Sequence, residues 1–175
     1  MVTTLSDGTA IRLRVIRPED KPLLDTAMRR LSPESARQRF LTAKPHLTSR
    51  ELRYLTEIDG IDHVAVVAVL PHDPQMLVAV GRFVRHPDRR DEAEVAIVVG
   101  DGLQGLGLGR TLGLVLADEA WARGIRRFTA LLLGTNQAAR RLFAAIAESL
   151  EVEYHDGLQE LVLELGHREP PRLVA

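Results

Sequence analysis

The segment Gln104-Gly105-Leu106-Gly107-Leu108-Gly109-Arg110 places three glycines at alternate positions, directly before a run of apolar residues at helical spacing. Glycine lets the backbone turn sharply, so several N–H groups can point toward one place. Such a cluster of amides at the positive end of a helix dipole predicts a binding site for phosphate oxygens. A plain glycine turn that caps the helix is the alternative interpretation.

Two common phosphate-binding motifs do not fit this segment. The dinucleotide pattern G-x-G-x-x-G needs glycine where Arg110 stands if it begins at Gly105, and where Leu112 stands if it begins at Gly107. The loop of nucleoside triphosphatases needs Gly-Lys followed by Ser or Thr, which the chain lacks. Ordinary dinucleotide and ATP sites are therefore disfavoured.

Metal and serine-hydrolase chemistry have little support in the sequence. The chain has no cysteine, and its 6 histidines, at positions 46, 63, 72, 86, 155 and 167, include no i, i+4 pair. The nucleophile motif G-x-S-x-G is also absent. We therefore expect neither a metal site nor a serine nucleophile.

The elements that must position the glycine segment can be read from periodicity. Helical signals cover Pro18 to Leu31, Ser32 to Phe40, Thr48 to Thr56, the stretch from Gly109 to Arg123-Gly124, and the stretch beginning at Asn136. Strand signals cover Ile11 to Val15, His63 to Leu70, Met76 to Val84, Glu94 to Val99, Phe128 to Leu133, and two strands flanking Asp156-Gly157. The glycine segment therefore lies between a strand and a helix.

Length and composition indicate one globular domain. The 175 residues have 45% hydrophobic and 27% charged side chains, which is typical of a chain with a single core. We assign residues 1–166 to this domain and expect 167–175, with Pro170-Pro171, to form a flexible tail.

Charge and hydropathy limit the classes of partner. The 23 basic and 24 acidic side chains give a net charge of -1, which disfavours a nucleic-acid binder. No apolar run approaches the roughly 20 residues that span a bilayer, and the start of the chain carries no export signal. We expect no membrane partner and a cytoplasmic location, which the lack of cysteine also fits.

The glycine segment matches Q/R-x-x-G-x-G/A, and the chain resembles the GNAT superfamily of N-acetyltransferases, whose loop holds the pyrophosphate of acetyl-CoA. Leu31 to Ser35, Arg39-Phe40 and Ala93 to Ala96 are similar to the branch of bacterial protein-lysine acetyltransferases. The resemblance implies an α+β fold with a mixed, mostly antiparallel sheet of about seven strands. It also implies a V-shaped splay between the fourth and fifth strands, and about four to five flanking helices.

The resemblance also implies which residues hold acetyl-CoA. Main-chain groups of Ile97, Val98 and Val99 would pair with the pantetheine arm, while those side chains belong to the core of a buried strand. The remaining implied contacts are Gln104, Gly105, Leu106, Gly107, Leu108, Gly109, Arg110, Thr111, Asn136, Arg141 and Phe143. Asn136 is alternatively a plain helix N-cap. Arg140 and Arg141 would reach the 3′-phosphate of CoA, and these two and Arg110 are alternatively solvated side chains.

Acyl transfer to an amine needs a neutral nucleophile, whereas an alkylammonium, with a pKa of about 10.4, is mostly protonated near neutral pH. A base must therefore remove a proton, directly or through water. Glu94 stands where the similar lysine acetyltransferases place their catalytic Glu, and we expect it to be partly buried beside Val95 and Ile97. A rim carboxylate paired with Arg89 or Arg90 is the alternative.

If Glu94 points away, Asp91 and Glu92 are the substitutes. Many members of the superfamily use a Tyr seven residues beyond the Asn as general acid, and here that position is Phe143. Water or the substrate would then protonate the thiolate. Tyr154 is the only other tyrosine late in the chain.

The resemblance therefore implies an acetyl-CoA-dependent N-acetyltransferase, acting by direct attack on a small-molecule amine or a protein lysine. The alternative is a CoA-binding or acyl-CoA-binding sensor module with little catalysis. A homodimer paired through a sheet edge is compatible with the sequence. Four arginines near the expected acceptor groove either favour an acidic protein surface or form solvated helix faces: Arg29, Arg30, Arg37 and Arg39.

Overall fold

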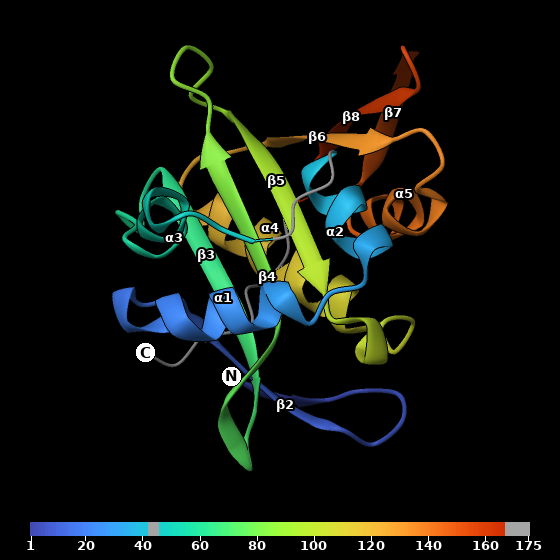
Figure 1. The fold of residues 1–175 in the computed structure, drawn as a ribbon. Helices are drawn as coiled ribbons and strands as arrows, with labels where there is room; N and C mark the ends of the chain where they lie inside the picture. The colour runs from blue at the N-terminus through green and yellow to red at the C-terminus, as the bar shows by residue number, and fades with distance from the viewer. Residues whose placement is uncertain (42–45, 167–175) are drawn as a thin grey trace.

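The computed structural model describes residues 1–41 and 46–166, and its central feature is one open 8-stranded sheet (Figure 1). In sheet order the strands are β1 (Val2–Thr4), β2 (Ala10–Val15), β3 (His63–Leu70), β4 (Asp73–Arg85), β5 (Glu92–Val99), β6 (Arg127–Leu133), β8 (Leu158–Glu164) and β7 (Ser149–His155). Neighbouring strands are antiparallel except β5 and β6, which are parallel. The predicted α+β fold with a mixed, mostly antiparallel sheet is confirmed.

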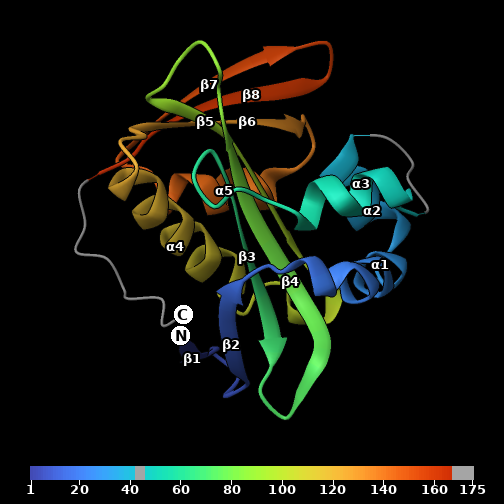
Figure 2. The ribbon, with the colours of Figure 1, turned by 90° about the vertical axis from the view of Figure 1, so that its left-hand side faces the viewer.

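The helices cover both faces of this sheet (Figure 2). On one face lie α1 (Lys21–Arg29), α2 (Pro33–Phe40) and α3 (Ser49–Thr56), and on the other lie α4 (Leu108–Ala122) and α5 (Gln137–Ala144). Short 3-10 turns at Pro18–Asp20 and Asp101–Leu103 precede α1 and the glycine segment. Because both faces are covered, the protein has two hydrophobic cores, one on each side of β3 and β4.

Local sequence signals explain most of these elements. In β2, Ile11 and Leu13 are fully buried while Arg12 is exposed, as the alternating pattern predicts. The capping box before α3 forms: the Thr48 amide donates to Glu51 Oε2 at 2.8 Å, and the Glu51 amide donates to Thr48 Oγ1 at 3.2 Å. Gly124, with a φ of 80°, ends the segment after α4.

The splay lies between β5 and β6. These strands pair only from Glu92 to Glu94, opposite Arg127 to Thr129, whereas β5 stays paired with β4 as far as Val99. The Gly100 amide donates to Val78 O at 2.8 Å, so Gly100 and Val78 form a hydrogen-bonded pair. Because such pairs alternate along an antiparallel ladder, Val98 also bonds to β4, whereas the main-chain groups of Ile97 and Val99 point away from it. The main-chain groups of Ile97 and Val99 therefore face the gap that the splay opens.

Several boundaries differ from the sequence prediction. The short edge strand Val2–Thr4 brings the sheet to 8 strands, so the splay separates the fifth and sixth rather than the fourth and fifth. Strand β4 begins at Asp73, so the turn is confined to Pro71-His72 and Pro74 lies within the strand. The prediction of a flexible tail concerns 167–175, which lie outside the described residues.

Within the described part of the chain, every helix falls short of the length and apolar character needed to span a bilayer.

Candidate active site

The glycine segment forms a turn that leads into α4. Gly105 and Gly107 have φ angles of 76° and 91°, in the left-handed region, and a Cβ at either position would meet open space. Gly109 serves another purpose, because a Cβ there would collide with Leu142 of α5. Two of the glycines therefore shape the turn, and the third lets two helices approach each other.

The turn presents a row of donors at the start of α4. The amides from Gly105 to Arg110 have no hydrogen-bond acceptor among residues 1–41 and 46–166. The first internal bond follows at Thr111, whose amide donates to Gly107 O at 3.0 Å. Unpaired amides at the positive end of a helix of 15 residues favour an anion, as the sequence predicted for this segment.

A cavity of about 650 Å³ brings the donor loop together with the splayed strand and α5. Of the residues predicted from the sequence, those that line it are Glu94, Ile97, Val98, Val99, Gln104, Gly105, Gly107, Gly109, Arg110, Asn136, Arg141 and Phe143. Leu106, Leu108 and Thr111 do not line it: Leu108 is fully buried in the core beneath α4, and Leu106 packs against that core. The volume lies within the range of roughly 300 to 1,000 Å³ typical of small-molecule sites.

Asn136 is the N-cap of α5. Its Oδ1 accepts a hydrogen bond from the Ala139 amide at 3.0 Å, and its side chain is buried at the wall of the cavity. Its Nδ2 has no acceptor within the described parts of the chain. The capping role is therefore realised through the oxygen, and the amide nitrogen stays available to a ligand.

Glu94 is exposed, so the expectation of partial burial is wrong. It is the last residue of β5 that pairs with β6, and its side chain opens onto the cavity. The alternative ion pairs do not form: Arg89 binds Glu92 at 2.6 Å, and Arg90 binds Asp62 at 3.2 Å. Glu94 is therefore placed at the mouth of the splay without an arginine from its own loop.

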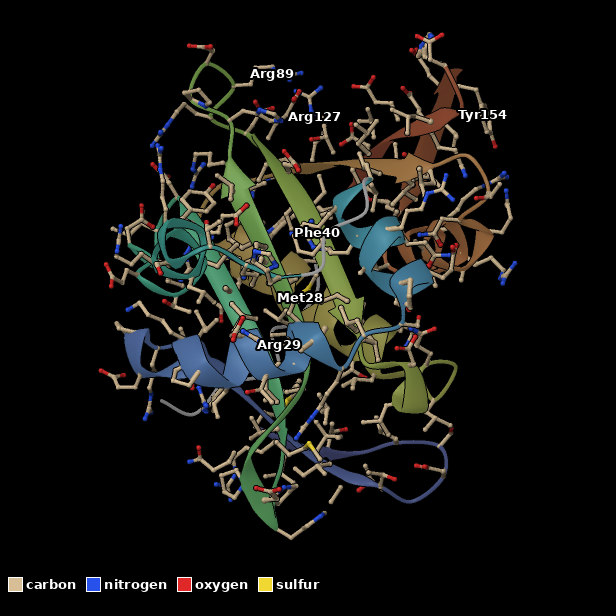
Figure 3. The ribbon with its side chains drawn as sticks, viewed as in Figure 1. Met28, Arg29, Phe40, Arg89, Arg127 and Tyr154 are labelled. Atoms are coloured by element: carbon tan, nitrogen blue, oxygen red, sulfur yellow. The ribbon has the colours of Figure 1, made fainter. Side chains whose placement is uncertain are left out.

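The two substitute carboxylates are engaged elsewhere. Arg127 Nη2 lies 2.8 Å from Asp91 and 3.0 Å from the buried Glu92. Figure 3 shows Arg89 and Arg127 near the outer end of β5, well away from Phe40. Neither Asp91 nor Glu92 lines the cavity.

The position expected for a general acid carries no proton donor. Phe143 is almost fully buried, with 3% of its surface exposed. Tyr154 lies on β7 at the edge of the sheet, and its hydroxyl accepts a hydrogen bond from Arg140 at 2.9 Å (Figure 3). Because Tyr154 does not line the cavity, it is not positioned to replace the missing donor.

A hydrogen-bond network that sequence reasoning missed ties the loop to α2. Asp101 Oδ1 accepts from Ser35 Oγ at 2.5 Å and from Ser32 Oγ at 3.0 Å, and Oδ2 accepts from the Ser32 amide at 2.8 Å. Gln104 Nε2 donates to Ser35 Oγ and to Val99 O, both at 3.1 Å. Hydrogen bonds from Ser35 and Ser32 lower the pKa of Asp101. The Ser32-Pro33 pair signalled a helix start, but nothing in the sequence linked it to Asp101.

A second cavity, of about 260 Å³, lies on the α1–α3 side of β4 and β5. The two cavities share five lining residues: Arg39, Phe40, Ala96, Val98 and Leu103. They therefore meet along β5. This arrangement can hold two ligands in contact at the splay.

Comparison with known proteins places this geometry in a family. The model of the acetyltransferase (GNAT) family matches residues 27–147. An acetyltransferase of Pseudomonas aeruginosa is 30% identical over 146 residues, which make up 83% of this chain and 78% of that protein. Acetyltransferase Pat of Mycolicibacterium smegmatis is 35% identical over 136 residues, 77% of this chain but only 40% of that longer protein.

Solved structures of other proteins have the same fold as this chain. The GNAT domain of S. lividans PAT superposes with a TM-score of 0.86 at 30% identity, covering 94% of this chain and 96% of that one. The structure of yncA from Salmonella typhimurium with its cofactor acetyl-CoA has a TM-score of 0.66 at 19% identity, covering 93% and 99%, and shows the fold alone. Because the family model spans more than half of the chain and a relative of similar length is 30% identical, the chain belongs to the acetyltransferase (GNAT) family.

Proposed function

We propose that this protein transfers an acetyl group from acetyl-CoA to a primary amine, with Glu94 as the general base. The observation that carries the proposal is the convergence on one cavity of two main-chain surfaces that lack main-chain partners. One is the row of loop amides from Gly105 to Arg110, and the other is the edge of β5 at the splay.

The residues present fit acetyl-CoA. The loop amides would bind its diphosphate, and the Ile97 and Val99 main-chain groups would pair with its pantetheine arm. Val98 takes part differently, because its main-chain groups face β4 and its side chain lines both cavities. Arg110, Arg141 and the Asn136 amide nitrogen lie around the same cavity and would add polar contacts. Acetyl-CoA supplies an acetyl group activated as a thioester.

Glu94 would accept the proton that the amine must lose, directly or through water. The chain has no cysteine to carry the acetyl group, so the amine would attack directly. With Phe143 in place of a tyrosine, water would protonate the leaving thiolate. Any primary amine that reaches the splay fits this scheme, including the side chain of a protein lysine.

Isothermal titration calorimetry with acetyl-CoA tests the loop assignment. Gly107→Glu introduces a carboxylate among the phosphate-binding amides, so we expect acetyl-CoA to bind about 10- to 100-fold more weakly. Gly60→Glu is the matched control, because Gly60 also has a positive φ, of 71°, with open space at its Cβ, and lines neither cavity. Unchanged affinity in Gly107→Glu would contradict the assignment.

The alternative, a CoA-binding module with little catalysis, is separated by a second measurement. Release of free thiol from acetyl-CoA is followed with a panel of amines and lysine peptides. Saturable, amine-dependent release supports the enzyme. Tight acetyl-CoA binding without release for any acceptor would support the module.

A further inference from the structure

The smaller cavity has mostly apolar walls. Leu24 and Met28 of α1, Leu55 of α3, and Leu77 and Val80 of β4 line it. In Figure 3, Met28 and Phe40 lie over the same side of the sheet, in front of β4 and β5. At about 260 Å³ the cavity is just below the roughly 300 to 1,000 Å³ typical of ligand sites, so it suits a small molecule with an apolar part.

Three arginines line this apolar cavity: Arg30 is exposed, and Arg39 and Arg82 form a less exposed pair. Arg82 of β4 has only 6% of its surface exposed, and Arg39 of α2 is half-buried. Burial, together with the positive charge of Arg39, lowers the pKa of Arg82 to about 9, so its guanidinium is still charged at neutral pH. Neither Arg39 nor Arg82 forms an ion pair with a carboxylate within the parts of the chain that the structure describes.

The protein partners of Arg82 are neutral. Its Nη1 donates to Leu55 O at 3.2 Å and lies 3.2 Å from His63 Nε2, which must accept because a guanidinium can only donate. Burial and the charge of Arg82 lower the pKa of His63 to about 4, which keeps the ring neutral. A buried charge that has only neutral partners is costly, and an anion in the cavity would offset that cost.

Glu94 lies next to the arginine pair. Arg82 is paired with Ala96 in the ladder and Glu94 with Val84, so Arg82 and Glu94 are diagonal neighbours on one face, about 7 to 8 Å apart at the backbone. The charge of Glu94 also acts on Arg39. A positive site and a negative site therefore stand side by side where the two cavities meet.

We propose that the acceptor is a free α-amino acid with an apolar side chain, bound by its carboxylate to Arg82 and Arg39. This inference rests on the proposed function. A guanidinium fork matches a carboxylate in a bidentate manner. The α-amine, on the adjacent carbon, would then face Glu94, and the apolar side chain would fill the space between Leu24, Met28 and Leu55.

The reaction would acetylate the α-amine. The amine nitrogen forms a C–N bond with the acetyl carbonyl carbon, and the C–S bond of the thioester breaks. The proton lost by the amine goes to Glu94 and from there to the solvent. The leaving sulfur takes one proton from the solvent, so the proton count is unchanged. The products are an N-acetyl amino acid and free CoA.

The experiment compares leucine with leucinamide and isopentylamine, which keep the apolar part and the amine but lack the carboxylate. Free thiol release gives kcat/KM for each, in the unmodified protein and in Arg82→Gln, Arg39→Gln and Arg37→Gln. Arg37 is the matched control, because it is exposed on the same helix as Arg39 and lines neither cavity. Circular dichroism and the Kd for acetyl-CoA verify that each variant is folded.

We expect kcat/KM for leucine to exceed that for leucinamide by roughly 10- to 100-fold, the value of a charged hydrogen-bonded contact. Arg39→Gln and Arg82→Gln should largely abolish this preference by raising KM for leucine. Arg37→Gln should keep the preference. Because Arg39 is half-buried, its variant stays informative if Arg82→Gln does not fold.

Equal rates with leucine and leucinamide, or better turnover of a lysine peptide than of leucine, would overturn the proposal and leave the acetyltransferase function standing. Absence of acetyl-CoA binding would instead overturn the proposed function. In that case the binding of leucine can still be tested without acetyl-CoA, as a rise in the Tm of the protein when leucine is added. A rise in the unmodified protein that is lost in Arg39→Gln supports the anion site, and no rise contradicts it.

Discussion

Three carboxylates stand close together at the start of β5, and they differ in whether an arginine binds them. Asp91 and Glu92 are held in ion pairs with Arg127, and Arg89 also binds Glu92. Only Glu94 is left to open onto the cavity at the splay. These three carboxylates lie within four positions of the sequence, but their ion pairs decide which of them faces the cavity.

Glu94→Gln removes the proposed proton acceptor but keeps the size of the side chain. We expect kcat to fall about 10²- to 10⁴-fold, the usual contribution of a general base, with little change in the Kd for acetyl-CoA. Thiol-release kinetics and calorimetry measure the two quantities. Asp91→Asn is the control and should retain kcat, since Asp91 lines neither cavity. If Glu94→Gln kept full activity, another group would have to be the base.

Among the elements, the Asp101 network joins the start of α2 to a distant segment, the end of β5 with the glycine segment that follows it. Through Ser32 and Ser35 it holds the start of α2, and through Gln104 it holds the end of β5 and the beginning of the glycine segment. The helix that carries Arg39 is therefore fastened to the loop that would bind the phosphates.

Asp101→Ala should loosen both segments. Loss of hydrogen bonds to a charged group costs about 1.5 to 3 kcal/mol, so we expect a lower free energy of unfolding and higher KM values for both acetyl-CoA and the amine. Urea unfolding and steady-state kinetics test this. Asp25→Ala, which removes a surface i, i+4 pair with Arg29, should cost at most about 0.5 kcal/mol and leave both KM values unchanged.

The elements themselves were largely predictable, because their signals are local. Alternation in β2, the capping box before α3 and the glycine after α4 each involve residues close together in the chain. Contacts over long distances in sequence were not predictable. The hydrogen bond between Ser32 and Asp101, which are 69 positions apart, depends on how the sheet brings its strands together. The placement of Arg82 beside Arg39 depends on it as well. The exposure of Glu94 was wrongly predicted for the same reason: it depends on where β6 diverges.

At the scale of the whole molecule, buried ionisable groups make stability depend on pH. His63 has a pKa of about 4 in the folded protein, lowered by burial and by Arg82. The unfolded chain would protonate it near its ordinary pKa of 6.5, so the unfolded state takes up the proton first as the pH falls. Stability should therefore decrease between about pH 6.5 and pH 4.

Urea unfolding across this range provides the measurement. His63→Gln, which keeps a hydrogen-bonding side chain without titrating, should flatten the decrease. A carboxylate contributes in a lower window: burial alone would raise the pKa of Asp20, but hydrogen bonds from Arg14 and the Arg17 amide lower it. Its stabilisation is lost only as the pH falls below the ordinary value of 3.8. If His63→Gln left the pH profile unchanged, the loss of stability between about pH 6.5 and pH 4 could not be assigned to His63.

The bare edge of β5 beyond Glu94 means that the sheet is incomplete in the protein alone. Acetyl-CoA bound along this edge as proposed would extend the sheet, so it would act as a temporary strand as well as an acetyl donor. Saturation at 100 times Kd would add about 2.7 kcal/mol to the folded state. The concentration of the thioester would then affect how readily the protein unfolds and is cut by proteases.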